Sequence, residues 1–280
     1  MPFRFALNTS TIRGQNLPLD KEFEVAAQAG YDGIEPWVPK IHDFVKGGGS
    51  LRDLAKRAKD LNLVIQSTIG FAEWIVDDEA RRAKGLEQMK HDMDVVAQIG
   101  GQRIAAPASG ANRNDSPRID LHRVAERYLA VCEIGHNVGV IPECEVWGFS
   151  PNLTTLADAT YVVMSSGHPD GCVLPDIYHL YKGGSPITGL RQLNGKQFHN
   201  LHVNDYPPAP AREQIGDAQR VYPGDGVAPL GEIFRALRDI GYTGFLSLEL
   251  FSEALWKRNP LEVAKTGLEK TRAAVQKALA

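Results

Sequence analysis

Three acidic residues and one histidine stand at the ends of short apolar segments in the second half of the chain. They are Glu145, Asp176, His202 and Glu249. Carboxylate oxygens and one imidazole nitrogen suit a hard or borderline divalent cation that keeps open positions for substrate oxygens. Three carboxylates gathered in one place would also repel each other without a cation. The residue types therefore predict one divalent metal ion, with Mn²⁺ or Co²⁺ favoured and Zn²⁺ or Mg²⁺ also compatible.

Each of these residues also has a simpler explanation when it is taken alone. A single Asp or Glu after a strand is commonly a helix N-cap or a solvated loop residue. A single histidine in an apolar strand is commonly a hydrogen-bonded core residue. The joint pattern favours the metal site, because the simpler explanations do not place acids after three strands and a histidine on a fourth.

The elements that must position these groups alternate along the whole chain. Apolar runs typical of strands cover residues 3–8, 33–37, 64–68, 103–107, 140–147, 172–176, 198–204 and 245–250. Segments of helical period cover residues 19–29, 51–61, 77–98, 121–137, 153–166, 229–240 and 261–277, and a weak sixth helix is expected within 185–194. Eight strand–helix units in this length predict a (β/α)8 TIM barrel, organised as one domain over residues 1–280. An open doubly wound sheet is disfavoured because no GxGxxG loop follows the first strand.

Further candidate residues stand where the active site of a barrel lies, at the carboxyl ends of its strands. We expect Trp37, Gln66, Trp147 and Lys182 to contact the substrate. Tryptophan faces suit the C–H face of a polyol ring, and the glycine pair after Lys182 would let its side chain reach inward. Loop covering, buried hydrogen bonding and a solvated lysine are the competing structural explanations for these residues.

The composition narrows the classes of partner. The formal net charge of −3 gives no reason to expect a nucleic-acid partner. No segment resembles a signal peptide or is long enough to span a membrane. The three cysteines have no CxxC spacing, which argues against a disulfide framework or a cysteine zinc site. We therefore expect a cytoplasmic protein that acts on a small molecule, without a membrane or nucleic-acid partner.

Five segments together resemble one known superfamily: CEVWG, PDIYHLYKGG, HNLHVND, RVYPGDG and LSLELF. The chain is similar to the sugar phosphate isomerase/epimerase superfamily of xylose isomerase-like TIM barrels, and within it to the inosose isomerases, from GYDGIE to the C-terminus with gaps in the first half. The resemblance assigns the metal ligands to the same four residues as above. It also implies substrate or metal-site contacts for His179 and Arg220. Glu143 competes with Glu145, which we prefer because it lies in the EVWG context.

The resemblance implies an activity on a sugar or keto-inositol. A proton would be removed next to a ketone and returned elsewhere through an enediolate, with Glu145 and Glu249 as the acid/base pair. A ketose 3-epimerase, or a lyase that cleaves an oxidised (3-keto) glycoside, remains open. A nuclease resembling endonuclease IV is disfavoured by the small number of histidines in motif positions, and a non-catalytic sugar-binding barrel by the intact ligand set. Relatives are commonly dimers or tetramers, so a homo-oligomer is a further open expectation.

Overall fold

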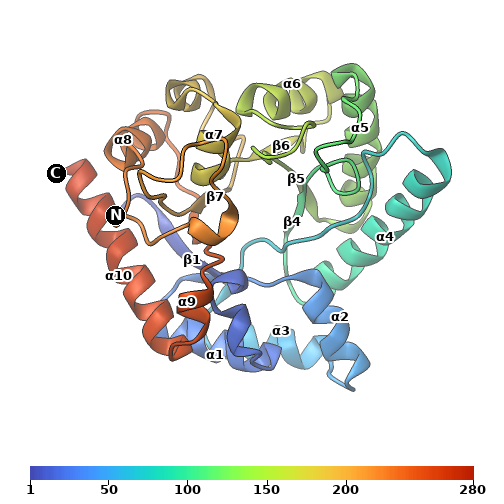
Figure 1. Ribbon diagram of the computed structural model, residues 1–280. Coiled ribbons are helices and arrows are strands. Elements are labelled where there is room, and N and C mark those ends of the chain that lie inside the picture. Colours follow the sequence, from blue (N-terminus) through green and yellow to red (C-terminus); the bar gives the residue numbers. More distant parts are fainter.

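Eight short parallel strands form the middle of the computed structural model, which describes residues 1–280, and helices surround them (Figure 1). The strands are β1 (Arg4–Asn8), β2 (Gly33–Glu35), β3 (Val64–Ile65), β4 (Arg103–Ala106), β5 (Ile141–Glu145), β6 (Cys172–Leu174), β7 (Asn200–Val203) and β8 (Phe245–Leu248). The α-helices are α1 (Leu19–Ala29), α2 (Val38–Lys46), α3 (Leu51–Asp60), α4 (Glu79–Gln98), α5 (Leu121–Val138), α6 (Leu156–Ser166), α7 (Ile177–Gly183), α8 (Leu230–Asp239), α9 (Glu253–Trp256) and α10 (Pro260–Leu279). Three 3₁₀ segments complete the fold, namely η1 (Thr9–Gln15), η2 (Ile187–Gln192) and η3 (Asp217–Gln219).

Strand pairing closes the sheet into a ring. One set of neighbours runs β3-β2-β1-β8-β7 and a second runs β4-β5-β6, all parallel. Single bridges join the two sets, Ile69 with Ala105 on one side and Asp176 with His202 on the other. The predicted (β/α)8 barrel is therefore confirmed, and the carboxyl ends of all eight strands open at one face.

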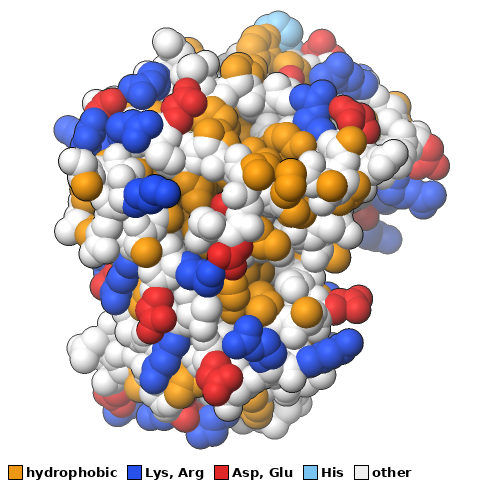
Figure 2. Space-filling view, turned by 60° about the vertical axis from the view of Figure 1, so that its left-hand side comes forward, with side chains coloured by type: hydrophobic (Ala, Val, Ile, Leu, Met, Phe, Trp, Pro, Cys, Tyr) orange, Lys and Arg blue, Asp and Glu red, His pale blue; other side chains and the backbone are white.

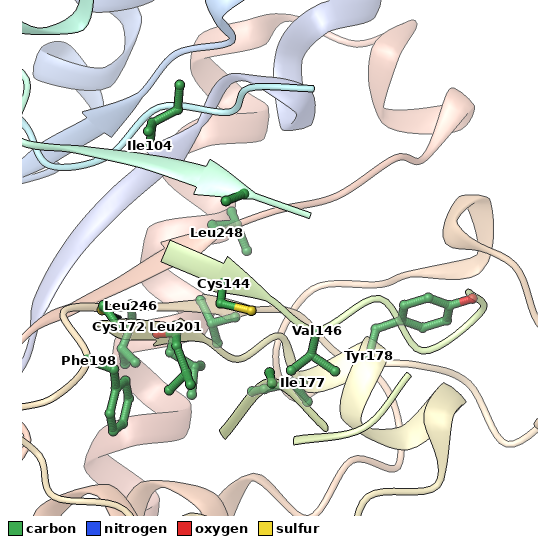
Figure 3. Packing of buried hydrophobic residues seen from close by; sticks show 14 of the residues in the cluster. Ile104, Cys144, Val146, Cys172, Ile177, Tyr178, Phe198, Leu201, Leu246 and Leu248 are labelled. Atoms are coloured by element: carbon green, nitrogen blue, oxygen red, sulfur yellow. Dashed lines mark hydrogen bonds between the residues drawn. The ribbon is translucent and has the colours of Figure 1, made fainter. Parts of the chain in front are cut away.

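Alternation along the strands separates the hydrophobic layer from the polar interior. Cys144, Leu201, Leu246 and Leu248 are buried in a single core cluster of 67 residues, part of which is shown in Figure 3. Their neighbours in sequence meet residues of non-adjacent strands instead, as when Ser67 Oγ donates to Glu143 Oε2 at 2.6 Å. A strand side chain reaches a non-neighbouring strand only across the inside of the barrel, so the polar residues fill the interior.

Helix positions depart from the expectation in the sixth unit. The prediction placed a weak helix within residues 185–194, but the structure has only the 3₁₀ segment η2 there, and the α-helix of this unit is α7, directly after β6. Asp176 is the N-cap of α7, and Gly184 ends it in a left-handed conformation. Pro186 and Gly189 then disfavour a second regular helix in the region that the prediction chose. The short elements η1, α2 and α9 were not expected at all.

On the face drawn in Figure 2, Lys and Arg side chains are interspersed with Asp and Glu, and hydrophobic side chains gather near the middle. None of the helices combines the length and apolar composition needed to cross a lipid bilayer. The three cysteines are buried and unpaired.

Candidate metal centre

The imidazole of His202 lies at the centre of the candidate site and is fully buried. Its Nδ1 is 3.2 Å from Glu249 Oε2, 3.6 Å from Glu145 Oε1 and 3.7 Å from Asp176 Oδ2. Possible ligand atoms of Asp176, His202 and Glu249 all lie within 4.8 Å of one another. The structure thus brings together the four residues that the sequence singled out, from β5, β7 and the carboxyl ends of β6 and β8.

The donor set fits a divalent cation. Neither ring nitrogen of His202 makes a hydrogen bond with acceptable geometry, although carboxylate oxygens face both. A buried polar atom normally has a partner, so two orphaned nitrogens in one ring call for an explanation. One imidazole nitrogen with carboxylate oxygens around it is a ligand set suited to Mn²⁺, Co²⁺, Zn²⁺ or Mg²⁺. Glu145, Asp176, His202 and Glu249 would hold such an ion.

A second layer of polar residues lies directly below the ligands. Glu35 Oε2 is 3.1 Å from His202 Nε2, the ring nitrogen that faces away from the other carboxylates. The same carboxylate accepts hydrogen bonds from Asn8 Nδ2 at 2.8 Å, Asn200 Nδ2 at 2.6 Å and Ser247 Oγ at 2.7 Å. A carboxylate on the far nitrogen of a metal-binding histidine fixes the tautomer and the orientation of the ring. Glu35 is placed to do this for His202.

Asn8 ties the lower layer to the ligands and to the pocket. Its Nδ2 also donates to Glu249 Oε1 at 3.1 Å, and its Oδ1 accepts a hydrogen bond from Trp37 Nε1 at 3.1 Å. One amide therefore connects Glu35, a candidate ligand and an aromatic side chain of the pocket.

Arg220 is a buried cation between two of the candidate ligands. Its Nη1 donates to Asp176 Oδ2 and to Glu249 Oε2, both at 2.8 Å. Its Nη2 lies 3.0 Å from His179 Nε2 and donates to Asp217 Oδ1. With 1% of its surface exposed, the side chain lies inside the barrel and is not a surface arginine.

Asp176 combines the two roles that the sequence presented as alternatives. Its Oδ1 accepts the backbone N–H of His179 at 2.8 Å and so caps α7. Its Oδ2 faces His202 and accepts hydrogen bonds from Arg220 and, at 3.1 Å, from Asn204 Nδ2. A helix cap at the end of β6 therefore also fixes the angle of a candidate ligand.

The two candidate catalytic glutamates have opposite electrostatic environments. Burial raises the pKa of Glu145 well above its usual value, and the charges of Glu249 and Asp176 add to this against the opposing effect of His202. Burial also acts to raise the pKa of Glu249, but the charges of His202 and Arg220 outweigh it, so that this pKa is lowered. The protein's own groups thus favour a protonated Glu145 and an ionised Glu249.

A pocket of about 180 Å³ opens above the candidate ligands. It is lined by Trp37, Ile69, Phe71, Glu145, Trp147, Phe149, His179, Asp217, Arg220, Glu249 and Phe251. Four of the six residues predicted to contact the substrate are in this set: Trp37, Trp147, His179 and Arg220. Their place beside the candidate ligands is compatible with that role.

The other two predicted contacts, Gln66 and Lys182, do not line the pocket. Lys182 Nζ donates to the backbone carbonyls of Arg212, Glu213 and Ile215 at 3.0, 3.0 and 2.9 Å, which secures the loop after β7. Gln66 is fully buried, and neither atom of its side-chain amide has a hydrogen-bond partner. In this arrangement the ammonium of Lys182 is bonded to the loop and does not line the pocket, and its contact with the substrate stays a prediction.

Glu143, the competitor of Glu145, lies one layer deeper in the barrel. It accepts the hydrogen bond from Ser67 and does not line the pocket. Burial raises the pKa of Glu143 to about 7, although the charge of Arg103 opposes this. The geometry therefore favours Glu145 as the residue that faces both His202 and the pocket.

The sequence analysis missed several residues of the site. Asn8, Asn200 and Ser247 were not singled out, although the last two stand two positions before a candidate ligand and so share its face of the strand. Phe71, Phe149 and Phe251 were missed as well. They lie in loops, where no periodicity indicates which way a side chain points.

Comparisons with known proteins agree with the fold. Over 269 residues the chain is 27% identical to a fructoselysine 3-epimerase of Escherichia coli O157:H7. This match covers 92% of this chain and 94% of the epimerase. It is 26% identical over 277 residues to an inosose isomerase of Bacillus velezensis, with 94% of each chain covered. A crystal structure of the IolI protein with a binding zinc atom superposes with a TM-score of 0.90 at 23% identity, over 99% of both chains. The model of the xylose isomerase-like TIM barrel family matches residues 23–274, and the chain belongs to that family.

Proposed function

We propose that this protein is a metal-dependent isomerase or epimerase of a small polyhydroxylated ketone, a sugar or a keto-inositol. The observation that carries the proposal is the placement of Glu145 and Glu249. Both carboxylates approach His202 Nδ1, at 3.6 and 3.2 Å, and both line the pocket. Two carboxyl groups in contact with the same small pocket can serve one bound molecule as acid and base.

The reaction follows from this pair. A divalent ion at the centre would supply Lewis-acid stabilisation of the negative charge that develops on the ketone oxygen. Glu249, held ionised by His202 and Arg220, is suited to accept a proton from the carbon beside the ketone. Glu145, which lines the same pocket, is placed to return one. Delivery to the other face of the same carbon gives an epimer, and delivery to the neighbouring carbon gives an isomer.

The names of the two relatives support this class without choosing within it. Epimerisation next to a ketone and ketone isomerisation both begin with removal of a proton from the adjacent carbon. The relatives share only about a quarter of their residues with this chain, so their substrates do not transfer to it. The loops that form the pocket walls determine the substrate, because loops vary most among proteins of one fold. Inosose and a ketohexose are accordingly the first two compounds to test.

Exchange of substrate hydrogen with deuterium from the solvent tests the proposal. The Mn²⁺-loaded protein is incubated with 2-keto-myo-inositol or D-fructose in D₂O, and deuterium incorporation is followed by NMR. We expect incorporation beside the ketone, and a loss on the order of 10²–10⁴-fold in Glu145→Gln and in Glu249→Gln. The exposed Glu253, close in sequence to Glu249, provides the control Glu253→Gln with unchanged exchange. Exchange that survives both glutamine variants would contradict the assignment.

A further inference from the structure

Two histidines and an aspartate lie together at the amino ends of the barrel strands, on the face opposite the candidate metal centre. His136 is in the last turn of α5, and His168 and Asp170 are in the short segment between α6 and β6. The helices α5 and α6 pack side by side (Figure 1), which brings these segments together. One possible ligand atom from each of the three residues lies within 4.8 Å of the other two. We call this group the His-His-Asp cluster, and the proposed reaction makes no use of it.

The carboxylate of Asp170 faces both imidazoles. Its Oδ2 is 2.9 Å from His136 Nδ1 and 3.9 Å from His168 Nδ1. Nitrogen and oxygen ligands of one tetrahedral Zn²⁺ lie about 3.3–3.4 Å apart, since each is about 2.0–2.1 Å from the ion. The two separations lie on either side of that value, so small side-chain movements would let the three atoms hold one ion.

The second histidine distinguishes the cluster from an ordinary surface ion pair. The pair of His136 and Asp170 alone would be exposed and weak, because 63% of the His136 side chain is open to solvent. The side chain of His168 is only 7% exposed, and its ring meets that of His136 edge to face with the centres 5.7 Å apart. One member of the cluster is therefore fixed by burial, while the exposed one leaves a route for an ion from solvent.

The turn that carries His168 and Asp170 is ordered by its own backbone. Gly167 ends α6 in a left-handed conformation, and the N–H of Gly171 donates to the carbonyl of His168 at 3.0 Å. His168 Nδ1 accepts the backbone N–H of Asp170 at 3.1 Å. A metal ion would take this same lone pair, so binding exchanges a hydrogen bond for a metal bond. The cluster should therefore bind an ion more weakly than the centre around His202.

The cluster also opens onto solvent. A hollow of about 400 Å³ is lined by His168 and Asp170 together with Lys196, Gln197 and His199. Three protein ligands beside such a hollow leave the fourth position of a tetrahedral ion free for a water molecule.

We propose that the His-His-Asp cluster is a second metal site, which binds Zn²⁺ through His136, His168 and Asp170. Imidazole nitrogens suit Zn²⁺, and Mn²⁺ stands far below it in the affinity order of such ligands. The ion would join the end of α5 to the segment that leads into β6. These two segments precede the strands whose carboxyl ends carry Glu145 and Asp176. The inference does not depend on the proposed function.

Titration of Zn²⁺ into the metal-free protein tests the site. Calorimetry is used at about pH 8, because a ligating histidine must be unprotonated. We expect two ions per chain, and an affinity at least about tenfold lower for the weaker one in His136→Ala and in Asp170→Asn. The matched control is His122→Ala, which removes an exposed histidine at the other end of α5 and should retain both ions. Zn²⁺ binding that is the same in all four proteins would overturn the inference.

Variants of the first centre separate the two sites. His202→Ala should still bind one Zn²⁺, at the cluster, and Glu249→Gln is tested beside it in case the histidine variant does not fold. Thermal unfolding shows which variants are folded. If the folded centre variants bind no Zn²⁺ while His136→Ala binds one ion, the inference fails and the first centre stands. If they bind one ion that His136→Ala abolishes, the inference stands.

Amide hydrogen exchange locates the ion without reference to activity. Zn²⁺ should slow exchange in residues 136–140 and 167–171 of the unchanged protein, and this local protection should be absent in His136→Ala. Protection confined to the strand ends around His202 would overturn the inference.

Discussion

Replacement of Glu35 by glutamine is expected to weaken metal binding although Glu35 is not a ligand. The carboxylate lies 3.1 Å from His202 Nε2 and accepts three hydrogen bonds, from Asn8, Asn200 and Ser247. Oε1 receives Asn200, and Oε2 receives Asn8 and Ser247 and faces His202. A glutamine has only one carbonyl oxygen, so its NH₂ group must point at donors on one side or the other.

The size of the effect follows from these contacts. If the amide nitrogen replaces Oε2, Asn8 and Ser247 lose their acceptor, and an NH₂ group takes the place of the carboxylate oxygen beside His202 Nε2. If it replaces Oε1, Asn200 loses its only partner on that atom. Each unsatisfied buried donor costs about 1–3 kcal/mol, and loss of the carboxylate beside a ligating histidine typically costs about 10–100-fold in metal affinity. We therefore expect a metal Kd about 10–100-fold higher in Glu35→Gln, with all four candidate ligands intact.

Calorimetric titration of Mn²⁺ into the metal-free protein measures this effect. Glu22→Gln is the matched control, because Glu22 is also a fully buried glutamate but lies on α1, away from the candidate ligands. Glu35→Asp, which keeps the charge on a shorter side chain, should recover part of the affinity. A Kd in Glu35→Gln equal to that of the unchanged protein would refute the role assigned to Glu35. So would an equal loss in Glu22→Gln.

Three further predictions concern other charged side chains. Burial raises the pKa of Glu22 to about 7, although the charge of Lys40 opposes this. The folded protein therefore binds more protons than the unfolded chain between about pH 4.5 and 7, and its stability falls as the pH rises through that window. Glu22→Gln should therefore stabilise the protein by up to about 3 kcal/mol at pH 8 and by little at pH 4, measured by urea unfolding at both pH values. Arg220→Gln leaves the carboxylates of Asp176 and Glu249 without their cation, so it should lower the free energy of unfolding by about 3–5 kcal/mol. Added Mn²⁺ should restore part of the lost Tm. An unchanged Tm in this variant would contradict the prediction. Lys182→Met removes the donor that holds three loop carbonyls, so amide hydrogen exchange should quicken in residues 206–222 while the rest of the barrel is unaffected.

The sequence predicted the barrel and the meeting of the candidate ligands because both depend on local signals. Apolar runs of strand length alternate with helical periods, and the carboxyl ends of parallel strands must share one face. Glu145, Asp176, His202 and Glu249 each follow or end such a run, so chain order alone brings them together. For Asp176, the helix cap and the candidate ligand are not alternatives, because its Oδ1 caps α7 while its Oδ2 faces His202.

The lower layer was within reach of the same reasoning. Side chains two positions apart on a strand share a face, so Asn200 and Ser247 are expected one layer below His202 and Glu249. Glu35 stands in the same relation to Trp37. What the pattern does not supply is which of these groups bond to each other across the barrel, because that depends on the stagger of strands far apart in the sequence.

The phenylalanine rings of the pocket and the sixth helical unit were not predictable in this way. Phe71, Phe149 and Phe251 lie in loops, and their ring contacts join segments far apart in the chain. For the sixth unit, the helical signal of residues 177–183 is only two turns long and follows the strand without a connecting loop. A helix that short gives too little periodicity to distinguish it from the strand before it. Lys182 lies in the last turn of α7 and not in a loop.

Metal stoichiometry tests whether the centre around His202 binds a divalent ion. Mn²⁺ is titrated into the metal-free protein by calorimetry and compared with His202→Ala and Glu249→Gln, with Glu253→Gln as the control. We predict one ion per chain in the unchanged protein and the control, with affinity at least about 100-fold lower in the two centre variants. Absence of binding by Mn²⁺, Co²⁺, Zn²⁺ and Mg²⁺, or binding that the centre variants leave unchanged, would contradict it.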